Sequence, residues 1–250
     1  MVCSGGPLLI RSWMHQVSLL KRQYGIEVIW VTSGAIASAV DKTGYHKSNR
    51  LLPQKQALSA IGQPLVMDLY NLGLQTVGAV GAQVLLSYGD LKDKIRLVNF
   101  KQAIEQLLEW DVVPVINEND VVATEEIRFG DNDALSAQVA HFSGADQLVI
   151  LTDVQGLYDA DPRKHPQAKL VARLEKVTPE LLLKTVPQAG TARGTGGMYS
   201  KLKAGKYAAE HFIDTRLVQG DLPRVLLRIA EGEDVGTLIQ ARKKRNGKKR

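Results

Sequence analysis

The sequence is poor in several residue types and patterns, and each absence excludes a class of protein. Its 250 residues include one cysteine, Cys3, so no disulfide can form within the chain. No apolar run approaches the roughly 18 residues that a membrane-spanning helix needs, and Pro7–Ile10 lacks the basic flank of a secretory signal. The histidines show no metal-ligand spacing; they are His15, His46, His141, His165 and His211. We expect a soluble, cytoplasmic protein without a bound structural metal.

The positive charge is concentrated at the C-terminus. The formal net charge is +6, and residues 241–250 contain seven Lys and Arg but no acidic residue. Subtracting these seven leaves −1, so the rest of the chain offers no basic face for nucleic acid. We expect residues 241–250 to form a basic, disordered tail, and we consider nucleic acid an unlikely partner.

Short apolar runs alternate with helical patterns along the chain. The runs predict buried strands at Ile26–Val31, Val80–Leu86, Val112–Ile116, Gln147–Leu151 and Thr215–Val218. Apolar residues three to five positions apart predict intervening helices, one through Ile10, Trp13, Val17, Leu20 and Tyr24, another through Val98, Ala103, Leu107 and Trp110. This alternation favours an α/β fold with a mainly parallel sheet covered on both faces. Such sheets bind ligands beyond the carboxyl ends of their strands.

The first candidate site follows the strand that ends at Val31. Ser33, Gly34 and Ala35 are small residues at a strand-to-helix turn, where backbone N–H groups can approach an anion. A simple helix cap would use the same residues.

A dense set of carboxylates and amides forms the second candidate site. Asn117–Asp120 ends one predicted strand, and Gly130–Asp133 opens the next helix. One acidic residue would suffice as a cap, and burying so many polar groups together is costly without a ligand or cations. The cluster could hold the ammonium group of an amino acid or organise lysines around a phosphate.

Two further polar segments suit a nucleotide. Thr152 and Asp153 end a predicted strand, although such residues are also common in turns. Gly194–Lys201 is glycine-rich, leads into a helix and carries a lysine, but it lacks the Walker A spacing. A surface loop is the alternative interpretation.

Taken together and in this order, the motifs resemble the amino-acid kinase family, and within it the branch that phosphorylates glutamate. The resemblance includes Lys55-Gln56, Gly62-Gln63 and Val113–Asp120, and it extends from about Ile10 to Leu238. It implies a three-layer αβα sandwich with a central, mainly parallel sheet. The kinase domain would span residues 1–240, with an acceptor half at about 1–145 and a nucleotide half at about 146–240.

The resemblance also implies the reaction and the roles of residues. The protein would transfer the γ-phosphoryl group of ATP, with Mg²⁺, to the side-chain carboxylate of L-glutamate, the first step of proline biosynthesis. Lys201 and Asp133 would be catalytic. The substrate would contact Ser33, Gly34, Ala35, Asp120, Asp131 and Asn132. The nucleotide would contact Thr152, Asp153, Thr195, Gly196, Gly197, Met198, Tyr199, Ser200 and Lys201.

The sequence departs from the family pattern in two places. No Lys-x-Gly-Ser/Thr motif occurs near Met1, where the family has an apolar strand ending in that motif. We therefore expect the first strand to be missing, the sheet to be interrupted and catalysis to be impaired. Many relatives also continue into a PUA domain, which we do not expect here.

Several alternatives remain open. Another acceptor, such as acetylglutamate, carbamate or UMP, would suit the same fold. A non-catalytic protein that binds glutamate or proline is a second possibility. The resemblance implies a homo-oligomer, a dimer or a tetramer.

Overall fold

The computed structural model describes residues 2–47, 49–122, 132–162, 165–186 and 197–242. The chain divides into two compact units. The first contains residues 1–132 and 221–233, and the second contains residues 133–220 and 234–250. None of the described helices combines the length and the apolar character needed to cross a membrane.

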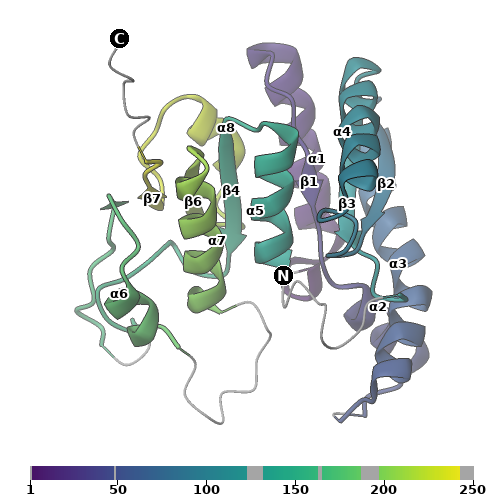
Figure 1. Cartoon of the computed structure of the whole chain (residues 1–250), viewed down its shortest axis with the longest axis horizontal. Coiled ribbons are helices and arrows are strands. Elements are labelled where there is room, and N and C mark those ends of the chain that lie inside the picture. The colour runs from purple at the N-terminus through teal and green to yellow at the C-terminus, as the bar shows by residue number, and fades with distance from the viewer. Residues whose placement is uncertain (1, 48, 123–131, 163–164, 187–196, 243–250) are drawn as a thin grey trace. The chain divides into compact units, whose positions relative to one another are not determined.

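The first unit is built on a parallel three-stranded sheet with the strand order β1-β3-β2. Helix α4 covers one face of this sheet, and α1 and α3 lie on the opposite face (Figure 1). The strands are β1 (Trp30–Val31), β2 (Val80–Leu86) and β3 (Val112–Glu118); the helices are α1 (Val2–Tyr24), α2 (Ala35–Thr43), α3 (Leu52–Gln75), α4 (Lys94–Glu109) and α8 (Val225–Ala230).

Two predictions in this unit are wrong in detail. The strand expected at Ile26–Val31 is reduced to Trp30 and Val31, because only these two residues pair with β3. Helix α4 buries Phe100 and Ile104, whereas Val98 and Trp110 of the predicted stripe are 51% and 67% exposed. Residues four apart share one helix face, and the face that meets the sheet decides which apolar side chains are buried.

The second unit is built on a mixed four-stranded sheet with the order β4-β6-β7-β5. Strands β4 and β6 are parallel, β6 and β7 are antiparallel, and β7 and β5 are parallel. The strands are β4 (Gln147–Thr152), β5 (Arg173–Leu174), β6 (Asp214–Gln219) and β7 (Thr237–Ile239); the helices are α5 (Asn132–Ser143), α6 (Pro179–Lys184) and α7 (Met198–Glu210). No ladder among the described strands joins this sheet to that of the first unit.

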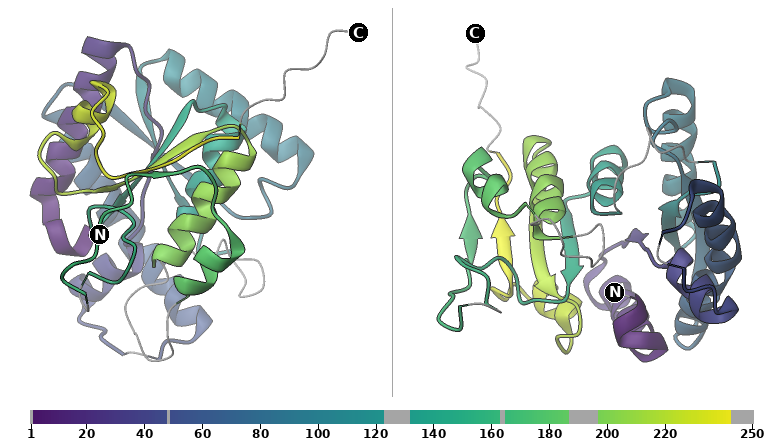
Figure 2. Two further views of the ribbon diagram at one scale, coloured as in Figure 1. Left: turned by 90° about the vertical axis from the view of Figure 1, so that its left-hand side faces the viewer. Right: turned by 90° about the horizontal axis from the view of Figure 1, so that it is seen from below.

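Helices α5 and α7 pack on the same face of the second sheet (Figure 2). Small residues allow this close approach: Ala137 and Ala140 of α5 and Ala204 and Ala208 of α7 join one buried apolar cluster. The cluster holds the two helices against the sheet. Both helices carry predicted site residues in their first turns.

Two residues of the predicted basic tail, Ala241 and Arg242, have partners in the second unit. The Ala241 N–H donates to Asp214 Oδ1 at 2.6 Å, and the Arg242 guanidinium pairs with Glu210 at 3.0 Å. These two residues are therefore held by the second unit. Residues 243–250 lie outside the described part of the chain.

Candidate functional site

The end of β1 is held by hydrogen bonds to β3 and α3. The Thr32 N–H donates to the Ile116 carbonyl at 2.8 Å, and Thr32 Oγ1 donates to the Tyr70 phenol oxygen at 2.8 Å. Ser33 follows in an exposed position. Gly34 then adopts a left-handed conformation with φ of 103°, which glycine accepts without strain, and α2 begins at the next residue. The chain therefore presents Ser33 on a short, firmly anchored turn.

Aromatic rings lie around Thr32. The Trp30 ring lies 5.6 Å from that of Trp13 and 6.0 Å from that of Tyr70, measured between centroids. Burial raises the pKa of the Tyr70 phenol, although the hydrogen bond with Thr32 opposes this effect. Tyr70 is 1% exposed and remains neutral at physiological pH, so it acts as a fixed polar partner for Thr32.

Helices α2 and α3 touch at Gly62. A Cβ atom on this residue would lie 1.7 Å from the Ala35 carbonyl oxygen, so only glycine fits. This backbone contact sets the position of the first turn of α2, which contains the predicted substrate residue Ala35.

Amide side chains meet at the end of β3. Asn132 Nδ2 donates to Asn117 Oδ1 at 2.9 Å and also to the Thr32 carbonyl. Asn117 Nδ2 donates to Gln63 Oε1 at 2.7 Å, and Asn117 is 2% exposed. The structure therefore brings predicted residue Asn132 next to the end of β1.

Asp120 is held separately by α3. Ser59 Oγ donates to Asp120 Oδ2 at 2.8 Å, and Ser59 is 3% exposed. Ser59, Gln63 and Tyr70 thus anchor three strand-end groups from one helix. None of these three α3 residues is among the predicted site residues. The available signal was their spacing of four and seven residues, which places all three polar side chains on one face of the helix.

Two predicted catalytic residues meet in the second unit. Lys201 Nζ lies 3.0 Å from Asp133 Oδ2 and 3.3 Å from Oδ1. Ser200 Oγ donates to Asp133 Oδ2 at 2.7 Å. The Lys201 and Asp133 side chains are 10% and 14% exposed, so solvent screens this pair weakly. The arrangement keeps a nearly buried ammonium group beside the first turn of α7.

The remaining predicted nucleotide residues are described in part. Thr152 is 2% exposed, and its Oγ1 lies 3.2 Å from Asp153 Oδ1. Gly197 precedes the first turn of α7, which contains Met198, Tyr199, Ser200 and Lys201. Asp131, Thr195 and Gly196 lie outside the described residues.

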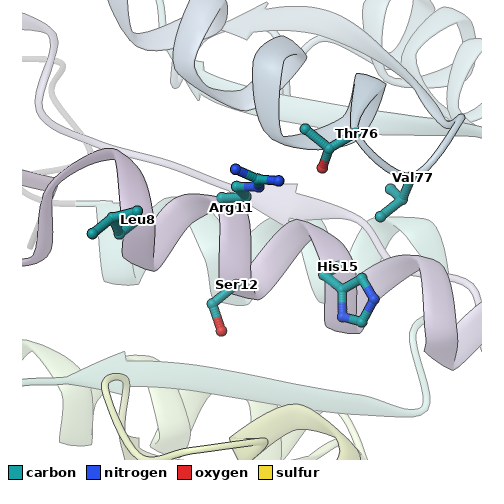
Figure 3. Close-up of a pocket in the computed structure, with 6 residues that line it drawn as sticks. All are labelled: Leu8, Arg11, Ser12, His15, Thr76 and Val77. Atoms are coloured by element: carbon teal, nitrogen blue, oxygen red, sulfur yellow. The ribbon is translucent and has the colours of Figure 1, made fainter.

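Two surface pockets of the first unit involve none of the predicted site residues. One, of about 410 Å³, is lined by residues of α1 together with Thr76 and Val77 (Figure 3). The other, of about 240 Å³, lies near the start of β2 and β3.

The amino acid kinase family matches residues 2–219, and the chain belongs to this family. It is similar to glutamate 5-kinases, with 44% identity to that of Caldanaerobacter subterraneus subsp. tengcongensis over 92% of this chain and 61% of the relative. The glutamate 5-kinase of Methylibium petroleiphilum is 44% identical over 93% of this chain and 62% of the relative.

The chain thus spans about three fifths of the length of these curated relatives. Among solved structures, UMP kinase from Bacillus anthracis matches with a TM-score of 0.60 and 15% identity, covering 94% of this chain and 87% of that chain. At this identity the likeness concerns the fold alone. The predicted fold class and family are confirmed.

Proposed function

We propose that this protein transfers the γ-phosphoryl group of ATP to the side-chain carboxylate of L-glutamate, as in the first step of proline biosynthesis. Family membership and the likeness to glutamate 5-kinases support the proposal. The observation that carries it is the start of α5. Asn132 donates hydrogen bonds to Asn117 Oδ1 and to the Thr32 carbonyl, and its neighbour Asp133 is paired with Lys201.

The chemistry suits residues of these types. A carboxylate is already ionised at pH 7, so its oxygen can attack the γ-phosphorus without a general base. The bond from that phosphorus to the ADP oxygen breaks, and the products are glutamyl 5-phosphate and ADP. Catalysis then depends on aligning two anions and on neutralising the charge that lies between them.

Each predicted residue has a role in this proposal. Asp120, Asp131 and Asn132 bind the amino acid, and the turn at Ser33, Gly34 and Ala35 receives its side-chain carboxylate. Lys201 neutralises charge on the transferred group, and Asp133 with Ser200 holds that ammonium in place. The contacts of Ser200 and Lys201 with Asp133 are short, and the Lys201 and Asp133 side chains are nearly buried.

The nucleotide is assigned to the second unit. Thr152 and Asp153 at the end of β4 would contact it, and Thr195 to Lys201 would surround its phosphates. Backbone N–H groups at the start of a helix favour phosphate oxygens, and α7 begins within this segment.

A magnesium ion fits this site as a companion of ATP. In the described part of the chain, no group of three His, Cys, Asp or Glu side chains could hold a metal ion. Mg²⁺ is commonly held by phosphate oxygens and water with few protein ligands. It would supply charge neutralisation on the phosphates, and we assign it no protein ligand.

The test is ADP release measured with L-glutamate, acetylglutamate, carbamate and UMP as separate acceptors. We expect turnover with L-glutamate to exceed that with each other acceptor. Equal or greater turnover with acetylglutamate would contradict the proposal. Calorimetric binding of L-glutamate without ADP release, even at high protein concentration, would instead indicate a non-catalytic binding protein.

A further inference from the structure

The orientation of the Asn117 amide is fixed by the backbone. The Glu118 N–H donates to Asn117 Oδ1 at 2.9 Å, and a backbone N–H can only donate. Oδ1 must therefore face Glu118, and Nδ2 must face the other way. Nδ2 meets Gln63 Oε1 at 2.7 Å, so each atom of the Asn117 amide has a defined partner.

Gln63 maintains this orientation from helix α3. It is 7% exposed, its Oε1 accepts from Asn117, and its Nε2 donates to Gln83 Oε1 at 3.0 Å. If Gln63 lost its acceptor, Asn117 Nδ2 would be buried without a partner. An unsatisfied buried donor is costly, so Asn117 would then move or rotate.

The fixed amide of Asn117 in turn orients the amide of Asn132. Asn132 Nδ2 donates one hydrogen to Asn117 Oδ1 and the other to the Thr32 carbonyl, and both oxygens can only accept. Both hydrogens of the Asn132 amide are therefore used. Its remaining polar atom is Oδ1, which can only accept a hydrogen bond, and no described residue donates to it.

We propose that Gln63 is a positioning residue that, through Asn117, holds Asn132 with Oδ1 ready to accept from the ammonium group of a ligand. Asp120 supplies a second acceptor of the same kind, because only its Oδ2 is engaged by Ser59. This inference rests on the proposed function and adds a basis for its specificity. The site selects an amino acid with a free ammonium group over a dicarboxylate that lacks one.

The test compares L-glutamate with glutarate, which has the same two carboxylates and no ammonium group. Dissociation constants are measured by calorimetry for the unaltered chain, Gln63→Leu and Gln63→Glu, with ADP release measured in parallel. We expect the unaltered chain to prefer L-glutamate, and Gln63→Leu to lower this preference roughly tenfold. The KM for ATP should stay unchanged. Gln63→Glu retains an acceptor for Asn117 and should keep most of the preference.

Gln75→Leu is the matched control, since Gln75 is an exposed glutamine at the end of the same helix. Gln63→Met, similar in length to Gln, replaces Gln63→Leu if the latter does not fold. A preference unchanged in Gln63→Leu, or equal weakening of both ligands, would overturn the inference. So would an unaltered chain that binds neither ligand or binds both equally. A chain that prefers L-glutamate but releases no ADP would overturn the kinase proposal alone, because the binding ratio still decides the role of Gln63.

Discussion

The two units hold their candidate site residues by different physical means. In the first unit, neutral amides and hydroxyls form directional hydrogen bonds at the ends of β1 and β3. In the second unit, Asp133 and Lys201 form a nearly buried ion pair. Hydrogen bonds between neutral groups fix which atom faces a ligand, whereas an ion pair keeps a charge available. The first unit is thus suited to recognition and the second to charge neutralisation.

We expect the largest effect from removing the positive charge of Lys201 in the second unit. Lys201→Met eliminates the ammonium group and leaves Asp133 with Ser200 as its remaining described partner. We expect kcat for ADP release to fall by roughly 10²–10³, about 3–4 kcal/mol, with a smaller change in the KM for glutamate. The control is Lys203→Met, two residues along the same helix and exposed. Similar losses in both variants would remove the distinction between the two units.

A backbone contact in the first unit should give the next largest effect. Gly62→Ala places a methyl group 1.7 Å from the Ala35 carbonyl oxygen, so α2 and α3 must separate. We expect a loss of about 1–3 kcal/mol in the free energy of unfolding, measured with urea, and a raised KM for glutamate. Gly89→Ala serves as the control, because its added atom meets only Ser87 Oγ, at 3.7 Å. A Gly62→Ala variant as stable as the control would show that this contact does not position the turn.

Removing one hydroxyl should have a smaller effect that is confined to substrate binding. Ser59→Ala removes the hydrogen bond to Asp120 Oδ2, and we expect the KM for glutamate to rise roughly fivefold. The kcat and the KM for ATP should remain close to those of the unaltered chain. Ser38→Ala, on α2, removes the same atom without touching Asp120. The prediction fails if kcat falls and KM does not change.

The smallest effect is expected from a charged group just after β2. Burial raises the pKa of Asp90, but hydrogen bonds from Ser87 and the Arg96 guanidinium outweigh it and hold the pKa below its usual value. A lowered pKa in the folded state stabilises the protein above the unfolded pKa of about 3.9, and this contribution disappears as the pH falls through the folded value.

Asp90→Asn should therefore melt at a slightly lower temperature than the unaltered chain at pH 7, and the difference should shrink toward pH 3. Thermal unfolding at a series of pH values measures this change. Asp93→Asn is a useful control, since Asp and Asn are comparable caps and Asp93 caps α4. A difference that grows on acidification would contradict the predicted direction.

Much of the fold could be predicted from local pattern. The strand at Val80–Leu86 is found as predicted, and three others differ only at their ends, by one or two residues. A continuous apolar run can be recognised as a strand without knowing which strands pair with it. Ile26–Val31 has the same character, yet most of it has no ladder partner. The buried face of α4 was also predicted wrongly, because α4 carries apolar residues on more than one side.

The chemical types present at the strand ends, and their order along the chain, follow from the sequence alone. Asn117, Asp120 and Asn132 were recognisable because several polar groups directly after an apolar run are costly without partners. The identity of those partners depends on how the chain folds. Ser59, the partner of Asp120, and Gln63, the partner of Asn117, lie far from these residues in sequence. The α3 face that carries both side chains meets the strand ends only after folding. The direction of the Asn132 amide depends on this arrangement, because an amide has no preferred orientation until its donors and acceptors are fixed in space.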